Sequence, residues 1–378
     1  MKESISKIKD AWAQHGQAGN VWLRSRQARA LEAFAGQGFP DKSLEDWRYT
    51  DLRRLAEQYP DSLAKPAAAL KGATPRSLDL GDAIRITFID GIFRPELSDT
   101  LPDGVMAGSM DEIAAADVKL LEHHWGSLAK DDDSGLISLN SAFANAGAAI
   151  SLRADTHLDQ PLHLDFHGTV EHISTQPRIL VKLGSGASAT LLEQYTGTAP
   201  QIVNAVTEIE CARNSHLRYF NIQDQHRDSW HTAAQYIQLD RDATVSTVHV
   251  DLGAELSRNE LRITLDGAHA SAECKGVFMA DGKRHVESRI SVTHAAEDTV
   301  SRERFRGILA DQARGVFNGR ILVEQAAQKT SAELTNRNLL LSKGAEINTK
   351  PELEIYADDV KCAHGSTTGQ LDDSALFY

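Results

Sequence analysis

The stretch Ile202-Val-Asn-Ala-Val-Thr-Glu-Ile-Glu-Cys211 is rich in β-branched residues, which favour extended structure. The turn residues Arg213-Asn-Ser215 close it, and a second run of the same kind, His216 to Gln223, follows at once. Short apolar runs bounded by turn residues are typical of strands. From about residue 150 onward this pattern recurs and helical periodicity largely disappears, which predicts a mainly β fold.

The other runs with this pattern predict further strands along the same half of the chain. They are Arg178 to Leu183, Thr190 to Tyr195, Gln235 to Leu239, Thr244 to Leu252, Glu260 to Leu265, Ala270 to Met279, Glu287 to Thr293, Val316 to Val323, Leu334 to Leu341 and Leu353 to His364. A sandwich or barrel and a solenoid of stacked coils both fit such a series. Roughly 200 residues would be long for one sandwich, whereas a solenoid grows by adding coils without thickening its core. We therefore predict a parallel β-helix, although no exact repeat is visible.

The N-terminal part of the chain has a helical pattern instead. The predicted elements are a helix from Ile5 to about Gln37, a short helix within Phe39–Leu52 capped by Ser43, a strand over Ala83–Asp90, and a helix from Met110 to about Trp125. The acidic run Asp131-Asp-Asp133 before Ser134 and Gly135 indicates a solvated linker. We therefore predict an N-terminal helical region with a short strand over 1–135, a β-helix core over 136–365, and the start of a truncated C-terminal segment over 366–378.

Composition excludes several classes of protein. The chain has 378 residues, 53 acidic and 40 basic side chains and a net charge of -13, which argues against a nucleic-acid binder. The three cysteines, 211, 274 and 362, are widely spaced and odd in number, which favours reduced thiols in the cytosol. The N-terminus shows no secretory signal and no apolar run approaches the roughly 20 residues that span a bilayer. We expect a soluble, cytoplasmic protein with no membrane partner.

Motifs for common enzyme chemistry are missing from the sequence. There is no Walker A stretch, no Gly-x-Ser-x-Gly, no His-Glu-x-x-His and no Cys-x-x-Cys. We interpret the three loose groups of histidines as surface or turn residues rather than ligands: His163, His167 and His172; His226 and His231; His123 and His124. The adjacent acids Asp358-Asp359 and Asp372-Asp373 are poor candidates for paired carboxylate chemistry, because neighbours on a strand face opposite sides.

Cys362 and His364 are the candidate metal ligands. They are two residues apart in a predicted strand, so their side chains project from the same face. A thiolate and an imidazole suit iron, zinc or copper(I), but two donors do not close a four-coordinate site. The spacing alone is equally compatible with a buried thiol beside a core histidine. If a metal binds here, further donors must come from elsewhere, and a partner chain is the natural source.

Longer stretches carry a resemblance to a known family. They are Gly315–Arg320, Ala326–Thr330, Asn336–Ser342, Glu346–Cys362, His364-Gly365, Gly369–Asp372 and Leu376–Tyr378. In order and length these strongly resemble the SufB/SufD family of iron-sulfur cluster assembly proteins. Phe39-Pro40 followed by Glu45-Asp-Trp-Arg-Tyr-Thr50 is similar to the SufD branch of that family.

The resemblance implies a right-handed parallel β-helix and a non-catalytic subunit that pairs with SufB, while the partner ATPase SufC hydrolyses ATP. It places Cys362 and His364 at the end of the solenoid that faces SufB. Our hypothesis is that His364 is the principal ligand there and Cys362 an auxiliary one, used only when SufB is present. A stable [4Fe-4S] cluster commonly takes four thiolates, so we expect only transient iron or cluster binding here. Homodimers also occur in the family. The chain ends at Tyr378, where relatives continue into SufC-docking helices, so we expect that segment to be largely missing.

Two other interpretations remain open from the sequence. The first is a β-helix enzyme acting on acidic polysaccharides, which would normally be exported. The second is SufB itself, the paralogue thought to carry the nascent cluster. The low cysteine content and the stretch Glu45-Asp-Trp-Arg-Tyr49 count against the second.

Overall fold

The structure is a computed structural model that describes residues 2–14, 19–63, 78 and 81–370. Strands account for 47% of the chain and helices for 20%. The helical elements are α1 (Lys2–Gln14), α2 (Val21–Gln37), the 3₁₀ turn η1 (Glu45–Trp47), α3 (Arg53–Ser62), the 3₁₀ turn η2 (Pro95–Leu97), α4 (Met110–His124) and α5 (Gly135–Phe143). All of them precede the long run of strands.

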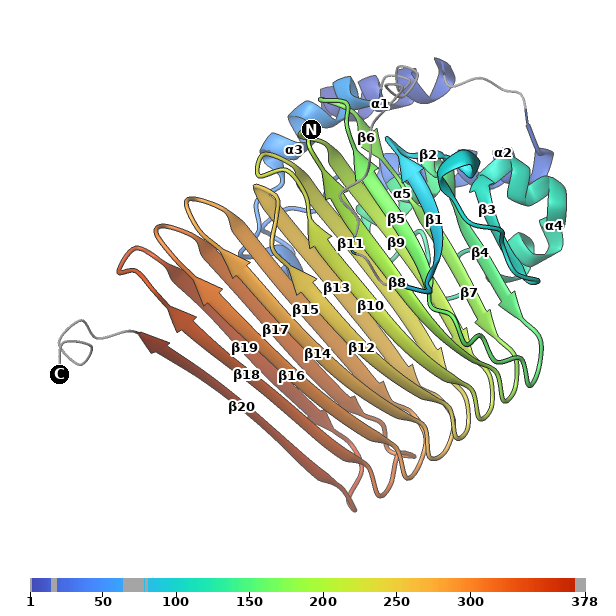
Figure 1. Ribbon diagram of the computed structural model, residues 1–378. Helices are drawn as coiled ribbons and strands as arrows, with labels where there is room; N and C mark the ends of the chain where they lie inside the picture. The colour runs from blue at the N-terminus through green and yellow to red at the C-terminus, as the bar shows by residue number, and fades with distance from the viewer. Residues whose placement is uncertain (1, 15–18, 64–77, 79–80, 371–378) are drawn as a thin grey trace.

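Two ten-stranded sheets form a right-handed parallel β-solenoid of about 8 turns (Figure 1). Sheet A contains, in spatial order, β2 (Ile92–Phe93), β1 (Ile84–Ile89), β5 (Leu162–Gly168), β8 (Ser188–Gly197), β10 (His216–Asp224), β12 (Thr244–Asp251), β14 (Ser271–Ala280), β16 (Val300–Leu309), β18 (Ser331–Leu340) and β20 (Lys361–Gln370). Sheet B contains β19 (Glu346–Ile355), β17 (Arg314–Val323), β15 (His285–His294), β13 (Leu256–Leu265), β11 (Trp230–Leu239), β9 (Ile202–Cys211), β7 (Arg178–Leu183), β4 (Ala146–Leu152) and β3 (Val105–Ser109), with β6 (Ser174–Thr175) pairing with β9. The predicted β-helix is thus confirmed.

Each coil contributes one strand to each sheet, and successive coils stack in register. Phe88 lies beside Phe166 and Phe166 beside Tyr195, with ring centroids 4.6 and 4.9 Å apart. Because parallel strands place equivalent residues side by side, every inward position forms a column along the interior. At the turns between strands, residues such as Asn214 and Asp242 adopt positive φ, a conformation that Asn and Asp tolerate well.

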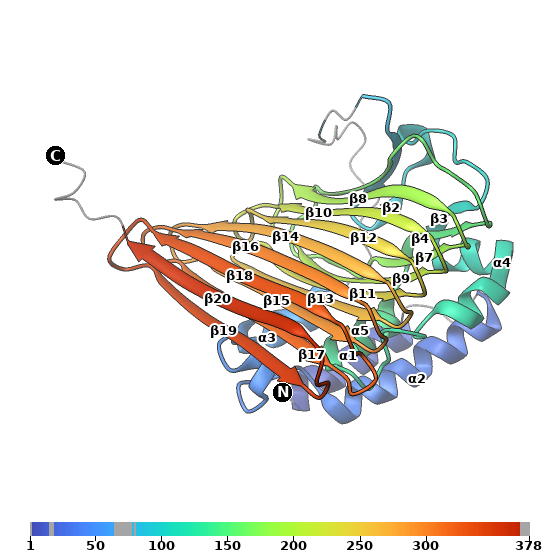
Figure 2. The same cartoon turned by 90° about the horizontal axis from the view of Figure 1, so that it is seen from below.

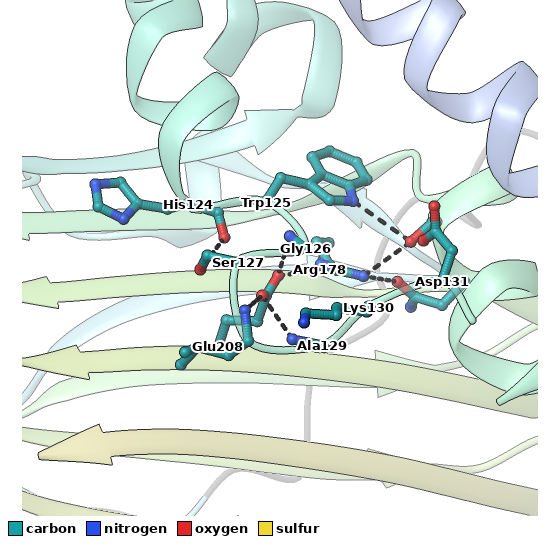
Figure 3. A network of polar contacts seen from close by, with 12 residues as sticks. His124, Trp125, Gly126, Ser127, Ala129, Lys130, Asp131, Arg178 and Glu208 are labelled. Carbon is teal, nitrogen blue, oxygen red and sulfur yellow. Dashed lines mark hydrogen bonds and ion pairs between the residues drawn. The ribbon is translucent and has the colours of Figure 1, made fainter. Parts of the chain in front are cut away.

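A buried ion pair on the outer face of sheet B attaches the N-terminal region to the solenoid (Figure 3). Arg178 is completely buried and contacts Glu208, which is 2% exposed. The Arg178 guanidinium also donates to Asn140 and Ser141 of α5, both at 3.2 Å. Glu208 accepts hydrogen bonds from the backbone N–H groups of residues 126, 128 and 129 at 2.8–2.9 Å. One ion pair therefore holds both α5 and the loop after α4.

The Glu45–Thr50 stretch is a second attachment. The Arg258 guanidinium lies 3.7 Å from the centre of the Trp47 ring, and Asp46 accepts a hydrogen bond from Arg289 at 2.5 Å. Glu45 pairs with Lys350 on the last strand of sheet B. This stretch therefore bridges three coils of sheet B.

Several local predictions are wrong. The predicted helix from Ile5 to Gln37 is two helices, and Asn20 caps the second by accepting from the N–H groups of Trp22 and Leu23. Ser43 does not cap η1, because its hydroxyl bonds to Asp41 at 2.5 Å. The predicted strand Leu353–His364 contains the end of β19, a turn and the start of β20.

The proposed linker is also more tightly held than the sequence suggested. Asp131 is not solvated, since it pairs with Arg26 and both side chains are 14% exposed. Strands β4, β5 and β16 and helix α5 lay outside the predicted elements. The division at residue 135 stays a prediction, although β1 already pairs with β5 in sheet A. The predicted C-terminal segment begins inside β20, and residues 371–378 lie outside the described residues.

Candidate functional site

Cys362 and His364 lie on β20, the terminal strand of sheet A, at the end of the solenoid farthest from β1 and β3 (Figures 1 and 2). In the register with β18, Cys362 lies beside Ala332 and His364 beside Leu334. Ala332 and Leu334 are 2% and 1% exposed, so both columns are interior ones. The two candidate ligands therefore extend the interior columns at the end of the rod, where no further strand of the described residues follows.

The environments of the two donors differ. Cys362 is half-buried against the core, and this burial raises the pKa of its thiol, opposed only by a weaker hydrogen bond with the Ala332 backbone. His364 is exposed. Neither group is sealed inside the protein, so both are accessible to a molecule that covers the last coil.

The backbone of β20 also presents unpaired groups. Lys361 donates its N–H to the Thr330 carbonyl at 2.8 Å, toward β18. Because backbone polar groups alternate sides along a strand, those of Cys362, His364 and Ser366 point to the other side. Within the described part of the chain no strand pairs with β20 on that side. Such an edge is a template for an added strand.

The opposite wall of the last coil supplies apolar surface. Ile347 and Leu353 of β19 are only partly buried against the core, and Ile355 is 41% exposed. The Ser366 hydroxyl donates to Thr349 at 3.0 Å and so connects the two walls. An apolar floor with a polar rim is the usual composition of a protein interface.

The other histidine groups do not assemble into a site. His163, His167 and His231 are buried, with exposed fractions of 0%, 4% and 0%, so their assignment to the surface is wrong. Burial lowers the pKa of His231 to about 3 and that of His163 to about 4, which keeps both rings neutral. No group of three or more His, Cys, Asp or Glu residues within the described chain could hold a metal ion.

The position of Asp358 and Asp359 gives no support to paired carboxylate chemistry. Asp358 and Asp359 lie in the turn between β19 and β20, outside both strands. Asp372 and Asp373 fall outside the described residues.

Three buried carboxyl groups in the interior columns were missed by the sequence reasoning. Burial raises the pKa of Glu193 to about 7, that of Asp251 to about 7 and that of Glu303 to about 8. Glu303 lies beside Cys274 and Leu334, in the column that ends at His364. A strict two-residue alternation through Ser301, Glu303 and Phe305 could have identified Glu303 as inward-facing.

Comparisons with known proteins agree with this architecture. The SufBD core domain of the SUF system for FeS cluster assembly matches residues 166–378, and the SufBD N-terminal region matches residues 16–164. The chain belongs to the SufBD family. An iron-sulfur cluster assembly SufBD family protein of Synechocystis is 32% identical, covering 100% of this chain and 86% of the relative. The iron-sulfur cluster assembly protein SufD of Escherichia coli is 30% identical, covering 94% of this chain and 83% of the relative.

The SufBD assignment makes this chain a SufD-like protein of iron-sulfur cluster assembly. The family assignment replaces one interpretation that the sequence left open, a β-helix enzyme acting on acidic polysaccharides. None of the helices in the described residues has the length and apolar character needed to cross a bilayer.

Proposed function

We propose that this SufBD protein is a non-catalytic scaffold subunit that pairs with SufB through its terminal coil and presents His364 and Cys362 to iron or a nascent iron-sulfur cluster. The observation that carries the proposal is the position of both donors at the accessible end of two interior columns, on an edge strand that no other strand in the described part of the chain covers. SufC would supply ATP hydrolysis as a separate subunit. A homodimer through the same edge is the competing assembly.

The donor count supports a shared site. A four-coordinate metal or a cluster needs more donors than one thiolate and one imidazole. The other two cysteines, Cys211 and Cys274, are 2% and 0% exposed, and burial raises the pKa of both thiols. They are therefore poor ligands, and the missing donors must come from the partner. The iron or cluster is the cargo of such a complex rather than a resident cofactor of this chain.

Replacing His364 with alanine should lower the rate of cluster assembly in the complete SufB–SufC–SufD complex by about tenfold or more, since losing a ligand or its support typically costs 10–100-fold. The measurement is anaerobic assembly followed by visible absorbance and bound iron. His123→Ala, at another exposed histidine, is the matched control. Assembly at the normal rate in the His364 variant would remove the basis for this role.

Replacing Ser366 with proline should weaken pairing about tenfold with little loss of folding. Proline removes one N–H, which at this position points to the free edge rather than toward β18. Sedimentation of the variant with co-purified SufB measures the association. Ser366→Ala controls for the lost contact with Thr349. Equal association of the proline and alanine variants would show that the edge backbone does not take part.

A further inference from the structure

The outer face of sheet A carries a cluster of positive charge, although the protein as a whole is acidic. Five cations lie on three adjacent strands: Lys275 on β14, Arg302, Arg304 and Arg306 on β16, and Arg337 on β18. We call this set the basic face. Only Glu273 and Glu333 share its outward rows, although the whole chain has a net charge of -13. The helices lie on the other side of the rod, against sheet B (Figure 2).

The register sets four of the cations in two short rows along the solenoid axis, while Arg302 lies between Glu273 and Glu333 in the neighbouring row. Lys275 lies beside Arg304, and Arg306 lies beside Arg337. Glu273 pairs with Lys275 at 2.9 Å and approaches Arg304 at 3.9 Å. Arg306 and Arg337 are exposed, and within the described chain neither forms an ion pair. The row formed by Arg306 and Arg337 is therefore available to carboxylates of another molecule.

An apolar row runs parallel to these cations. Met279 lies beside Ile308, and Ile308 lies beside Leu339, on the same three strands. Met279 is 43% exposed, and the other two are half-buried. Neighbouring strands are about 4.8 Å apart, so three side chains follow one another at roughly the spacing of successive turns of an α-helix, about 5.4 Å.

We propose that the basic face docks an acidic amphipathic helix of a partner protein, laid across β14, β16 and β18. Its apolar stripe packs on Met279, Ile308 and Leu339, and its flanking carboxylates pair with Arg306 and Arg337. The rest of this acidic molecule repels such a partner, so the charge contrast selects this one surface. The same net charge disfavours nucleic acid, whose binding depends on neutralising many phosphates. This surface is distinct from the terminal coil.

The test measures binding of a fluorescent synthetic helix with one leucine stripe flanked by glutamates, by anisotropy against the full-length protein. We expect binding that weakens as salt rises, and a loss of about tenfold or more in Arg306→Glu/Arg337→Glu. The matched control Arg153→Glu/Arg213→Glu makes the same change in net charge at exposed turn residues and should stay within about twofold. A peptide with lysine in place of glutamate should not bind.

Three results would overturn the proposal. They are absence of binding by the acidic helix, equal losses in the two double variants, and tighter binding of duplex DNA or phosphatidylserine vesicles than of the helix. Thermal unfolding of each variant shows whether the fold is kept, which we expect because the four replaced side chains are exposed.

Discussion

Replacing Glu208 with alanine should lower the free energy of unfolding by about 3–5 kcal/mol, because it leaves a charged guanidinium buried without its partner. Arg178 is fully buried and would keep its hydrogen bonds to Asn140 and Ser141 and its contact with the Trp125 ring, but no carboxylate. Three backbone N–H groups of residues 126, 128 and 129 would also lose their acceptor. Urea denaturation measures the loss.

The control for this prediction is a solvent-exposed ion pair, Lys9 with Glu32. Glu32 accepts from Lys9 at 3.0 Å, but its side chain is 71% exposed, so Glu32→Ala should cost less than about 1 kcal/mol. A cost for Glu208→Ala as small as that of Glu32→Ala would mean that water or a rearranged loop replaces the carboxylate. The anchoring role assigned to this ion pair would then be wrong.

Replacing Glu303 with glutamine should stabilise the protein at pH 8.5 by about 2–4 kcal/mol and change little at pH 5. Burial raises the pKa of Glu303 from its ordinary 4.5 to about 8, so the native state retains a proton that the unfolded state releases. Native stability is therefore lost as pH rises from about 4.5 to about 8. Glutamine is neutral throughout, so the variant escapes that loss.

The stability of the wild-type protein should pass through a maximum, because buried carboxyl groups lower it as pH rises and buried histidines lower it as pH falls. Glu193 and Asp251 add to the loss at rising pH, since burial raises both their pKa values to about 7. Burial lowers the pKa of His231 to about 3 and that of His249 to about 4. These rings stay neutral in the native state, so their contribution is lost as pH falls below about 6.5.

Urea denaturation of the wild type and of Glu303→Gln, at pH values from 5 to 8.5, separates the contribution of Glu303 from those of the other buried groups. Glu333→Gln makes the same substitution at an exposed carboxylate on β18 and is the matched control. Parallel pH profiles for the wild type and Glu303→Gln would show that Glu303 ionises freely and is not enclosed by the interior columns.

Strands were predictable wherever apolar and β-branched residues ended at a turn signal. Arg178–Leu183 and Ile202–Cys211 have the predicted bounds. Val300–Leu309 was missed because its outward positions hold three arginines, which mask the alternation. Helix α5 was missed because every residue in it is buried, including the polar Ser138, Asn140 and Ser141, so its polar residues do not mark a solvent-facing side with a helical period.

The candidate site could be predicted only in part. The two-residue spacing of Cys362 and His364 placed them on one face, and the structure confirms that they share a strand. Spacing could not say whether that face pointed inward or outward. The register with Ala332 and Leu334 decided this, because it continues two buried columns to the end of the rod.

The sequence by itself determined the class of fold, since alternation and turn residues act over a few neighbours and specify strands locally. It also determined the family, through stretches spread from residue 39 to the C-terminus. Only the tertiary structure decided which residues share a column, because coil-to-coil register joins residues about 30 positions apart, as Thr299 and Thr330 show with a separation of 31. The buried Arg178–Glu208 pair, the interior carboxyls with raised pKa values and the basic face all depend on that register, and no local pattern encodes it.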